Sequence, residues 1–182
     1  MPLFWTPAEG IRERSERDHV RYDLWARQGF LNTTPGRTID YRFVARNIAE
    51  LHGRMTIAGL KFDRWRIDDM VRALREEGVD AWVEGRDEPM PGGLRMIPHG
   101  QGFRDMNPAV ETLEDVLRHG MHPVLTMCAS NVRVQQDPSG NRKFDKIKST
   151  GRIDGIVALA MAMNGAVGGV PVEEDTFFVE VW

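Results

Sequence analysis

The chain has 182 residues, of which 41% are hydrophobic and 28% charged, as in an ordinary soluble domain with its own core. Its 24 basic and 27 acidic side chains give a net charge of −3, so contact with nucleic acid would need local basic clusters rather than the whole-molecule field. A single cysteine, Cys128, excludes a disulfide framework and a multi-cysteine zinc site. With no signal peptide and no apolar run of roughly 20 residues, we expect one cytoplasmic domain over residues 1–182, with no membrane partner.

The first predicted element is a short strand from Leu3 to Thr6, which Pro7 ends and a long charged stretch follows. After the turn at Pro35-Gly36, apolar residues at helical spacing from Ile39 to Leu51 predict an amphipathic helix. Thr38 is its expected N-cap.

The next elements predict an α/β fold. A short apolar strand from Ile57 to Phe62 precedes a helix that starts near Ile67 and ends at Gly78, and a second strand follows in VDAWVEG. The alternation of helices and strands predicts a sheet with a parallel component. Ligands of such sheets usually bind beyond the carboxyl ends of the strands, and Asp63 lies at such an end.

Residues 88–108 are rich in Gly and Pro and predict a long surface loop. Asn107-Pro108 is expected to open the next helix, and Pro123 another. Residues 132–148 alternate on either side of a turn-rich centre, which predicts a β-hairpin. Its second arm is basic and contains Arg142, Lys143, Lys146 and Lys148.

The segment KSTGRIDGIVALAMAMNGA predicts the most buried helix, because no residue from Ile156 to Met163 is polar. Ser149 or Thr150 is the expected N-cap, and Asp154 lies near the first turn. The C-terminal tail, 166–182, ends in a predicted peripheral strand.

Asp63 and Asp154 are carboxylates that such a fold could bring together at one rim of the sheet. Two acids are hard oxygen ligands for Mg²⁺ or Mn²⁺, and paired ions roughly 4 Å apart can activate water and stabilise the leaving oxygen of a phosphodiester. The alternative is that Asp154 is a helix-terminal acid favoured by the macrodipole and that Asp63 is a helix cap. Spacing alone does not decide between them.

The chain resembles the C-terminal nuclease domain of the large terminase subunit of tailed bacteriophages. The resemblance extends to about residue 165 and is carried, in order, by FWTP, YDLWARQGFLNTTPGRTIDY, IAGLKFDRW, GQGFRDMNPAVETLEDVL and KIKSTGRIDGIVALAMAMNGA. It implies an RNase H-like mixed sheet flanked by helices and an endonuclease that cuts concatemeric viral DNA with divalent metals. On the matching positions, it implies that Asp63 is the second and Asp154 the third metal-binding acid, with two Mg²⁺ or Mn²⁺ ions.

The resemblance also implies a DNA surface, because the hairpin matches a family element near the DNA and the site. The expected phosphate contacts are Lys143, Lys146, Lys148, Arg152 and Arg64. The implied partners are double-stranded DNA, the ATPase portion of the large subunit, the small terminase subunit and the portal, in the bacterial host of a phage or prophage.

Two departures from the family pattern shape the expectations. The family's first acid lies on a strand upstream of the match to LFWT, so we expect a sheet truncated at that edge and a metal site short of one ligand. Such an edge could pair with another copy of the chain. These 182 residues contain no G-x-x-x-x-G-K-[ST] motif, which predicts no ATP site.

Two other functions stay open. One is an inactive prophage remnant that serves only as a DNA- or motor-binding module, which the missing first acid favours and the two remaining acids oppose. The other is a different RNase H-type enzyme such as a resolvase, which would prefer branched DNA.

Overall fold

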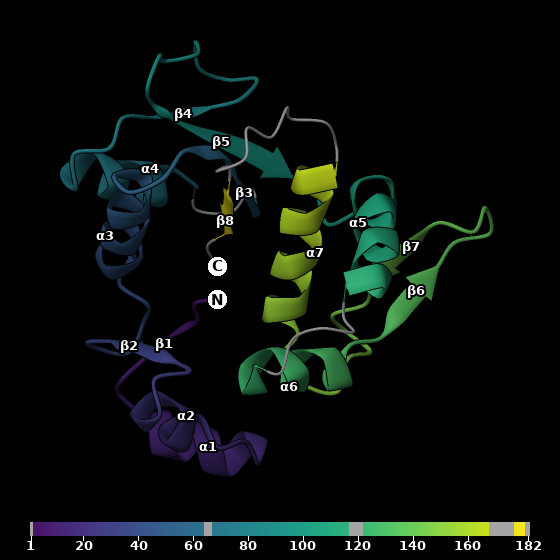
Figure 1. Ribbon diagram of the computed structural model, residues 1–182. Helices are drawn as coiled ribbons and strands as arrows, with labels where there is room; N and C mark the ends of the chain where they lie inside the picture. Colours follow the sequence, from purple (N-terminus) through teal and green to yellow (C-terminus); the bar gives the residue numbers. More distant parts are fainter. Residues whose placement is uncertain (1, 64–66, 117–121, 168–176, 181–182) are drawn as a thin grey trace.

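A computed structural model describes residues 2–63, 67–116, 122–167 and 177–180 (Figure 1). In chain order, the elements are β1 (Trp5–Pro7), α1 (Ile11–Asp18), α2 (Tyr22–Arg27), β2 (Asn32–Thr34), α3 (Tyr41–His52), β3 (Ile57–Asp63), α4 (Ile67–Glu76), β4 (Ala81–Val83), β5 (Leu94–His99), α5 (Phe103–Val116), α6 (Pro123–Asn131), β6 (Val134–Gln136), β7 (Arg142–Phe144), α7 (Asp154–Val167) and β8 (Phe177–Glu180). The predicted α/β class is confirmed. None of the helices within these ranges is long and apolar enough to cross a membrane.

A four-stranded sheet in the order β4-β5-β3-β8 forms the centre of the fold, and its strand pairs are parallel. The sequence predicted a sheet with both parallel and antiparallel strands. The antiparallel pair is β6-β7, and it forms a separate hairpin. Strand β8 pairs with β3, so β3 has a partner on each side within the chain. Strands β4 and β8 are the outer strands of this sheet.

Two apolar clusters hold helices against the sheet and against each other. Helices α3 and α4 pack with the strands through one cluster, which includes Leu60, Leu74 and Met96. Helix α7 packs with α5 and α6 through a second cluster, which includes Ile156 and Met161. Figure 1 shows the result: α3 and α4 lie on one side of the sheet, and α7 and α5 on the other. The predicted burial of α7 is confirmed.

The predicted surface loop over residues 88–108 was wrong. It contains β5, which pairs with both β3 and β4, and the first turn of α5. In β5 only Leu94, Met96 and His99 are buried, so the strand has no continuous apolar run, and the neighbouring Gly and Pro residues obscure it. Helix α5 includes Pro108, which lacks an N–H and removes one helical hydrogen bond without ending the helix.

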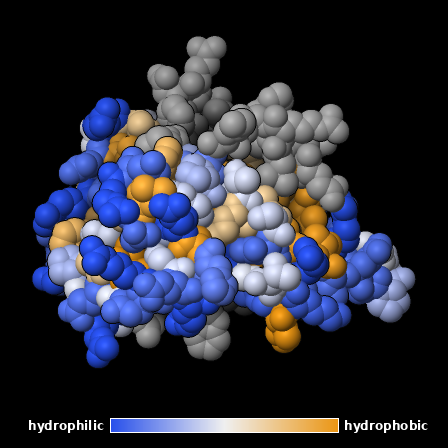
Figure 2. All heavy atoms as spheres, turned by 90° about the horizontal axis from the view of Figure 1, so that it is seen from below, coloured by the Kyte–Doolittle hydropathy of each residue, from blue (hydrophilic) through white to orange (hydrophobic). Residues whose placement is uncertain are grey.

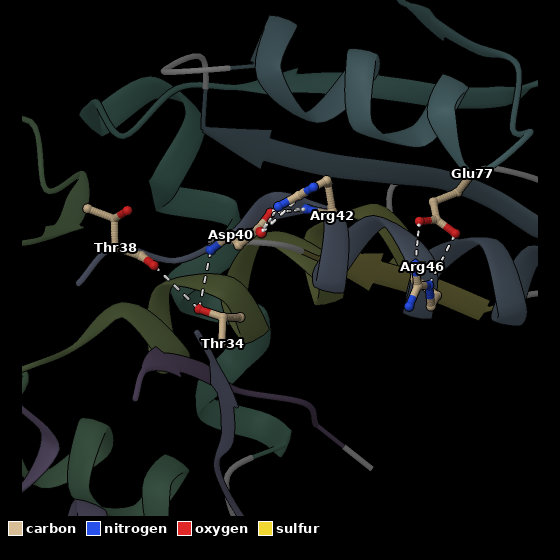
Figure 3. A network of polar contacts seen from close by, with 6 residues as sticks. All are labelled: Thr34, Thr38, Asp40, Arg42, Arg46 and Glu77. Carbon is tan, nitrogen blue, oxygen red and sulfur yellow. Dashed lines mark hydrogen bonds and ion pairs between the residues drawn. The ribbon is translucent and has the colours of Figure 1, made fainter. Parts of the chain in front are cut away.

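The turn before α3 is held by a buried threonine (Figure 3). Thr34 is fully buried, and its Oγ1 accepts a 3.2 Å hydrogen bond from the Asp40 N–H and donates to the carbonyl of Thr38. Asp40 Oδ1 accepts from the Arg42 N–H at 3.0 Å. Asp40, rather than the predicted Thr38, is therefore the N-cap of α3. At the other end of the view, Arg46 pairs with Glu77 beyond α4, which ties α3 to the end of α4.

Candidate functional site

The first candidate acid, Asp63, is the last residue of β3, as the sequence predicted. Its carboxylate is half-buried and accepts a 2.5 Å hydrogen bond from Gln101 Nε2, in the segment that follows β5. Across the parallel pair, Asp63 is in register with His99. Asp63 therefore lies at the carboxyl ends of β3 and β5, where α/β sheets usually bind ligands, and the Gln101 amide holds its carboxylate in place.

Polar side chains of β3, β5 and α7 meet beneath the strand ends that carry Asp63. Lys61 Nζ donates a 2.6 Å hydrogen bond to Asn164 Oδ1 in the last turns of α7, and His99 lies near the same asparagine. The His99 ring is 6% exposed, and its Nδ1 lies 2.8 Å from the Gly100 carbonyl. Burial, and then the charge of Lys61, lower the pKa of His99 below its ordinary value. The imidazole beside Asp63 is therefore neutral at neutral pH.

The second candidate acid, Asp154, is the first residue of α7, where the helix macrodipole favours a negative charge. Its side chain is 46% exposed, and Lys146 Nζ lies 3.7 Å from its carboxylate. Asp154 also lines a cavity of about 390 Å³, together with Phe4 and Cys128. Burial raises the pKa of the Cys128 thiol, so this cysteine is a protonated, apolar part of the wall.

The structure does not bring Asp63 and Asp154 together. The Asp63 rim meets α7 at Asn164, whereas Asp154 begins the same helix, about 15 Å earlier along its axis. In Figure 1 the arrowhead of β5 points to one end of α7, and α6 lies at the other. Within the described ranges, no three His, Cys, Asp or Glu side chains are grouped so that they could hold a metal ion. The described residues thus fit only part of a metal centre: Asp63 lies at one place, and at the other Asp154 lines a cavity whose wall also includes Asp18.

The predicted basic residues lie on the hairpin and on the segment between it and α7. Lys143 Nζ lies 4.6 Å from the centre of the Phe103 ring, a cation–π contact that orients this lysine. Lys148 is 74% exposed and lies 3.9 Å from Asp145. Arg152 lines the cavity beside Asp154. Arg64 lies outside the described residues.

Four residues of the Asp63 rim were missed in the sequence, namely Lys61, His99, Gln101 and Asn164. Two of them left a signal. Lys61 is a cation inside an otherwise apolar strand, and Asn164 is the first polar residue after the apolar run of α7. A polar side chain within a buried element needs a partner, and these two satisfy each other. Gln101 and His99 depend on β5, which the sequence did not reveal.

Residues 2–169 match the profile of the family described as "Terminase large subunit, endonuclease domain". The chain belongs to this family. The predicted resemblance is confirmed, and the match covers both candidate acids and the hairpin.

Individual relatives agree with this assignment. The chain is 46% identical over 181 residues to the terminase large subunit of Enterobacteria phage HK97, a match that covers 97% of the chain and 33% of the relative. The crystal structure of the HK97 bacteriophage large terminase superimposes with a TM-score of 0.76, over 91% of this chain and 33% of that one. Protein YmfN of Escherichia coli (strain K12) is 22% identical over 177 residues, 91% of the chain and 36% of the relative. The chain spans about a third of the length of these relatives.

Proposed function

We propose that this chain is the part of a phage or prophage large terminase subunit that cuts concatemeric double-stranded DNA during packaging. The observation that carries the proposal is the Asp63 carboxylate at the carboxyl end of β3, fixed by Gln101 beside the buried His99. Membership of the terminase endonuclease family supports the hydrolysis of a phosphodiester as the reaction in which Asp63 would take part.

The proposed cofactor is Mg²⁺ or Mn²⁺, as two ions, which would lower the pKa of bound water and polarise the phosphate. Asp63 offers a carboxylate oxygen, the ligand type that both ions prefer. Because Asp154 lies at the other end of α7, it could join the same ions only after the start of α7 moved toward β3. Lys61 is a positioning residue, because it bonds β3 to α7, and the buried His99 supports the neighbouring strand end beside Asp63.

The proposed DNA surface consists of Lys143, Lys146, Lys148, Arg152 and, in the undescribed segment, Arg64. Phosphate oxygens would pair with these cations and displace condensed counterions. The proposed partners of the whole protein are its own ATPase portion, the small terminase subunit and the portal, in the cytoplasm of the bacterial host. A second copy of the chain is a further proposed partner, at an outer strand of the sheet.

The test is the cleavage of supercoiled plasmid by the purified chain in Mn²⁺, in Mg²⁺ and in EDTA. We expect nicked and linear products with either ion and intact plasmid in EDTA. Asp63→Asn keeps the shape of the side chain and should abolish cutting. Asp68→Asn is the matched control, because this aspartate is 82% exposed on α4 and should keep the parent rate. An equal loss of cleavage in Asp63→Asn and Asp68→Asn would show that Asp63 has no specific role in cutting.

The second candidate function is a binding module without nuclease activity. The separation of the two acids favours it, since the described residues lack a complete metal centre. Metal-independent DNA binding with no cleavage in any of the three conditions would support this function. Cutting of branched DNA in preference to linear duplex would instead favour a resolvase.

A further inference from the structure

The most exposed large apolar side chain among the described residues is Ile147, at 96%. It lies in the turn after β7, between Lys146 and Lys148. Figure 2 shows a face on which hydrophilic residues predominate and apolar residues form small, scattered areas. The packing of this chain does not explain an isoleucine that is almost fully exposed to water between two lysines.

The turn is closed by its own hydrogen bonds. The Asp145 carboxylate accepts from the N–H groups of Ile147 and Lys148, both at 3.0 Å. The Asp145 carbonyl accepts from the Ser149 N–H at 3.1 Å and from the Ser149 hydroxyl at 2.6 Å. Residues 145–149 therefore form a defined turn whose apex carries Ile147.

The same turn is fastened to the elements beside it. The Asp145 N–H donates to the Arg133 carbonyl at 2.8 Å, and the Arg133 N–H donates to the Ser149 hydroxyl at 3.1 Å. The Thr150 N–H donates to the carbonyl of Asn131, the last residue of α6, at 3.1 Å. Since both ends of the turn are bonded to the hairpin stem and to α6, Ile147 projects from a supported base.

The surroundings of Ile147 indicate an anionic partner with an apolar interior. Three basic side chains lie near Ile147 in sequence. Lys148 is 74% exposed, and Lys146 Nζ lies 3.7 Å from the Asp154 carboxylate. Arg152 precedes Asp154 by two residues. The exposed Val134 lies in the neighbouring strand β6 and adds a second apolar side chain on the same hairpin. Duplex DNA offers both features, because its phosphates flank stacked bases. A protein partner would more often meet a contiguous apolar patch than one isoleucine between cations.

We propose that Ile147 is a wedge that enters between two base pairs of duplex DNA while Lys146 and Lys148 hold the flanking phosphates. Apolar side chains, isoleucine among them, act in this way from the minor groove and kink the duplex as they unstack a base step. The wedge would set the DNA on the hairpin next to Asp154. This inference rests on the proposed DNA-cutting function and adds to it the residue that deforms the substrate.

The test uses a duplex with 2-aminopurine, whose fluorescence rises when its base step is unstacked, and compares the parent with Ile147→Ala, Ile147→Met and Lys146→Ala. The parent and Ile147→Met should raise the fluorescence. Ile147→Ala should lose that rise and bind about three- to tenfold more weakly, with an unchanged salt dependence, because it removes apolar contact and no charge. Lys146→Ala should reduce the slope of log affinity against log salt by about one.

Two results would overturn the wedge. If the parent binds duplex without a rise in fluorescence at any 2-aminopurine position, Ile147 does not unstack a base step, although the proposed function stands. If the parent binds no duplex, the proposed function fails together with the wedge. Because Ile147 is exposed, Ile147→Ala should keep the melting temperature of the parent, so its effect on DNA will not reflect misfolding.

Discussion

Lys61 of β3 and Asn164 of α7 are joined by a 2.6 Å hydrogen bond across 103 positions of sequence. The buried His99 of β5, the strand paired with β3, lies near Asn164, so the end of α7 packs against both strand ends. This contact places the strand end that carries Asp63 against the C-terminal half of α7, and it thereby separates Asp63 from Asp154.

The Lys61–Asn164 bond predicts a specific pattern of stability. Asn164→Ala leaves the half-buried ammonium of Lys61 without this acceptor and should lower the free energy of unfolding by about 1.5–3 kcal/mol. Lys61→Met combined with Asn164→Leu removes both polar partners and should recover much of that loss. Urea denaturation of Asn164→Ala, of the double variant and of its two single variants, Lys61→Met and Asn164→Leu, measures the coupling. Strictly additive losses would show that the two side chains do not depend on each other.

Gly155, the second residue of α7, is required by close packing. A Cβ at this position would lie 2.6 Å from Phe4 Cε1 and 3.3 Å from Cys128 Sγ. Gly155→Ala should therefore destabilise the chain by about 1–3 kcal/mol. Gly102→Ala is the matched control, since a Cβ there meets nothing within 4 Å, and its melting temperature should stay near that of the parent. A Gly155→Ala protein as stable as the parent would contradict the packing of Phe4 against α7.

Two buried histidines predict that stability falls in mild acid. Burial lowers the pKa of both His99 and His122, and His122 lies between the rings of Phe4 and Phe30. In the unfolded chain each would titrate near its ordinary value of about 6.5, so below that pH the unfolded state binds more protons than the folded state. Their contribution is present above that pH and is lost as the pH falls toward the folded values.

Melting temperatures between pH 8 and pH 5 should therefore decrease with falling pH. Carboxylates with lowered pKa values, such as Asp40, lose their contribution only below this window. His122→Asn should be less stable at pH 8 and show a flatter profile. A parent profile that rises from pH 8 to pH 5 would contradict the burial of these rings.

The basic hairpin predicts the salt dependence of DNA binding. Lys143→Ala and Lys148→Ala should each weaken binding to any duplex sequence and reduce the slope of log affinity against log salt by about one. Arg72→Ala is the control, because it removes an exposed cation from α4, on the opposite side of the sheet from the hairpin (Figure 1). Equal slopes for all three variants would show that the hairpin is not the DNA surface.

Local patterns in the sequence were sufficient for the elements that carry both acids. The apolar run before Asp63 predicted β3, and the apolar run after Asp154 predicted α7, because burial on most sides removes polar residues from a segment. The turn-rich centre around Asp137 likewise predicted the hairpin, where that side chain accepts hydrogen bonds from Ser139 and Asn141.

The relation between the acids could not be predicted in the same way. It depends on β5, whose alternating burial and flanking Gly and Pro residues resemble those of a loop, and on the pairing of Lys61 with Asn164. Helices α1 and α2 were missed for a related reason. Neither contains a buried residue, so their sequences are rich in charge and lack apolar residues at helical spacing. Contacts distant in sequence decided these parts of the fold.

The most direct test of the account compares plasmid cleavage in Mn²⁺ by the parent, Asp63→Asn and Asp154→Asn, each at the same concentration of folded protein. We expect the parent to cut the plasmid and Asp63→Asn to leave it intact. If Asp154→Asn also loses cutting, the start of α7 must move toward the strand ends during the reaction. If Asp154→Asn still cuts, Asp154 only stabilises the start of its helix and takes no part in cleavage. Cutting by Asp63→Asn at the parent rate would contradict the assignment of the β3 rim as the centre of the nuclease.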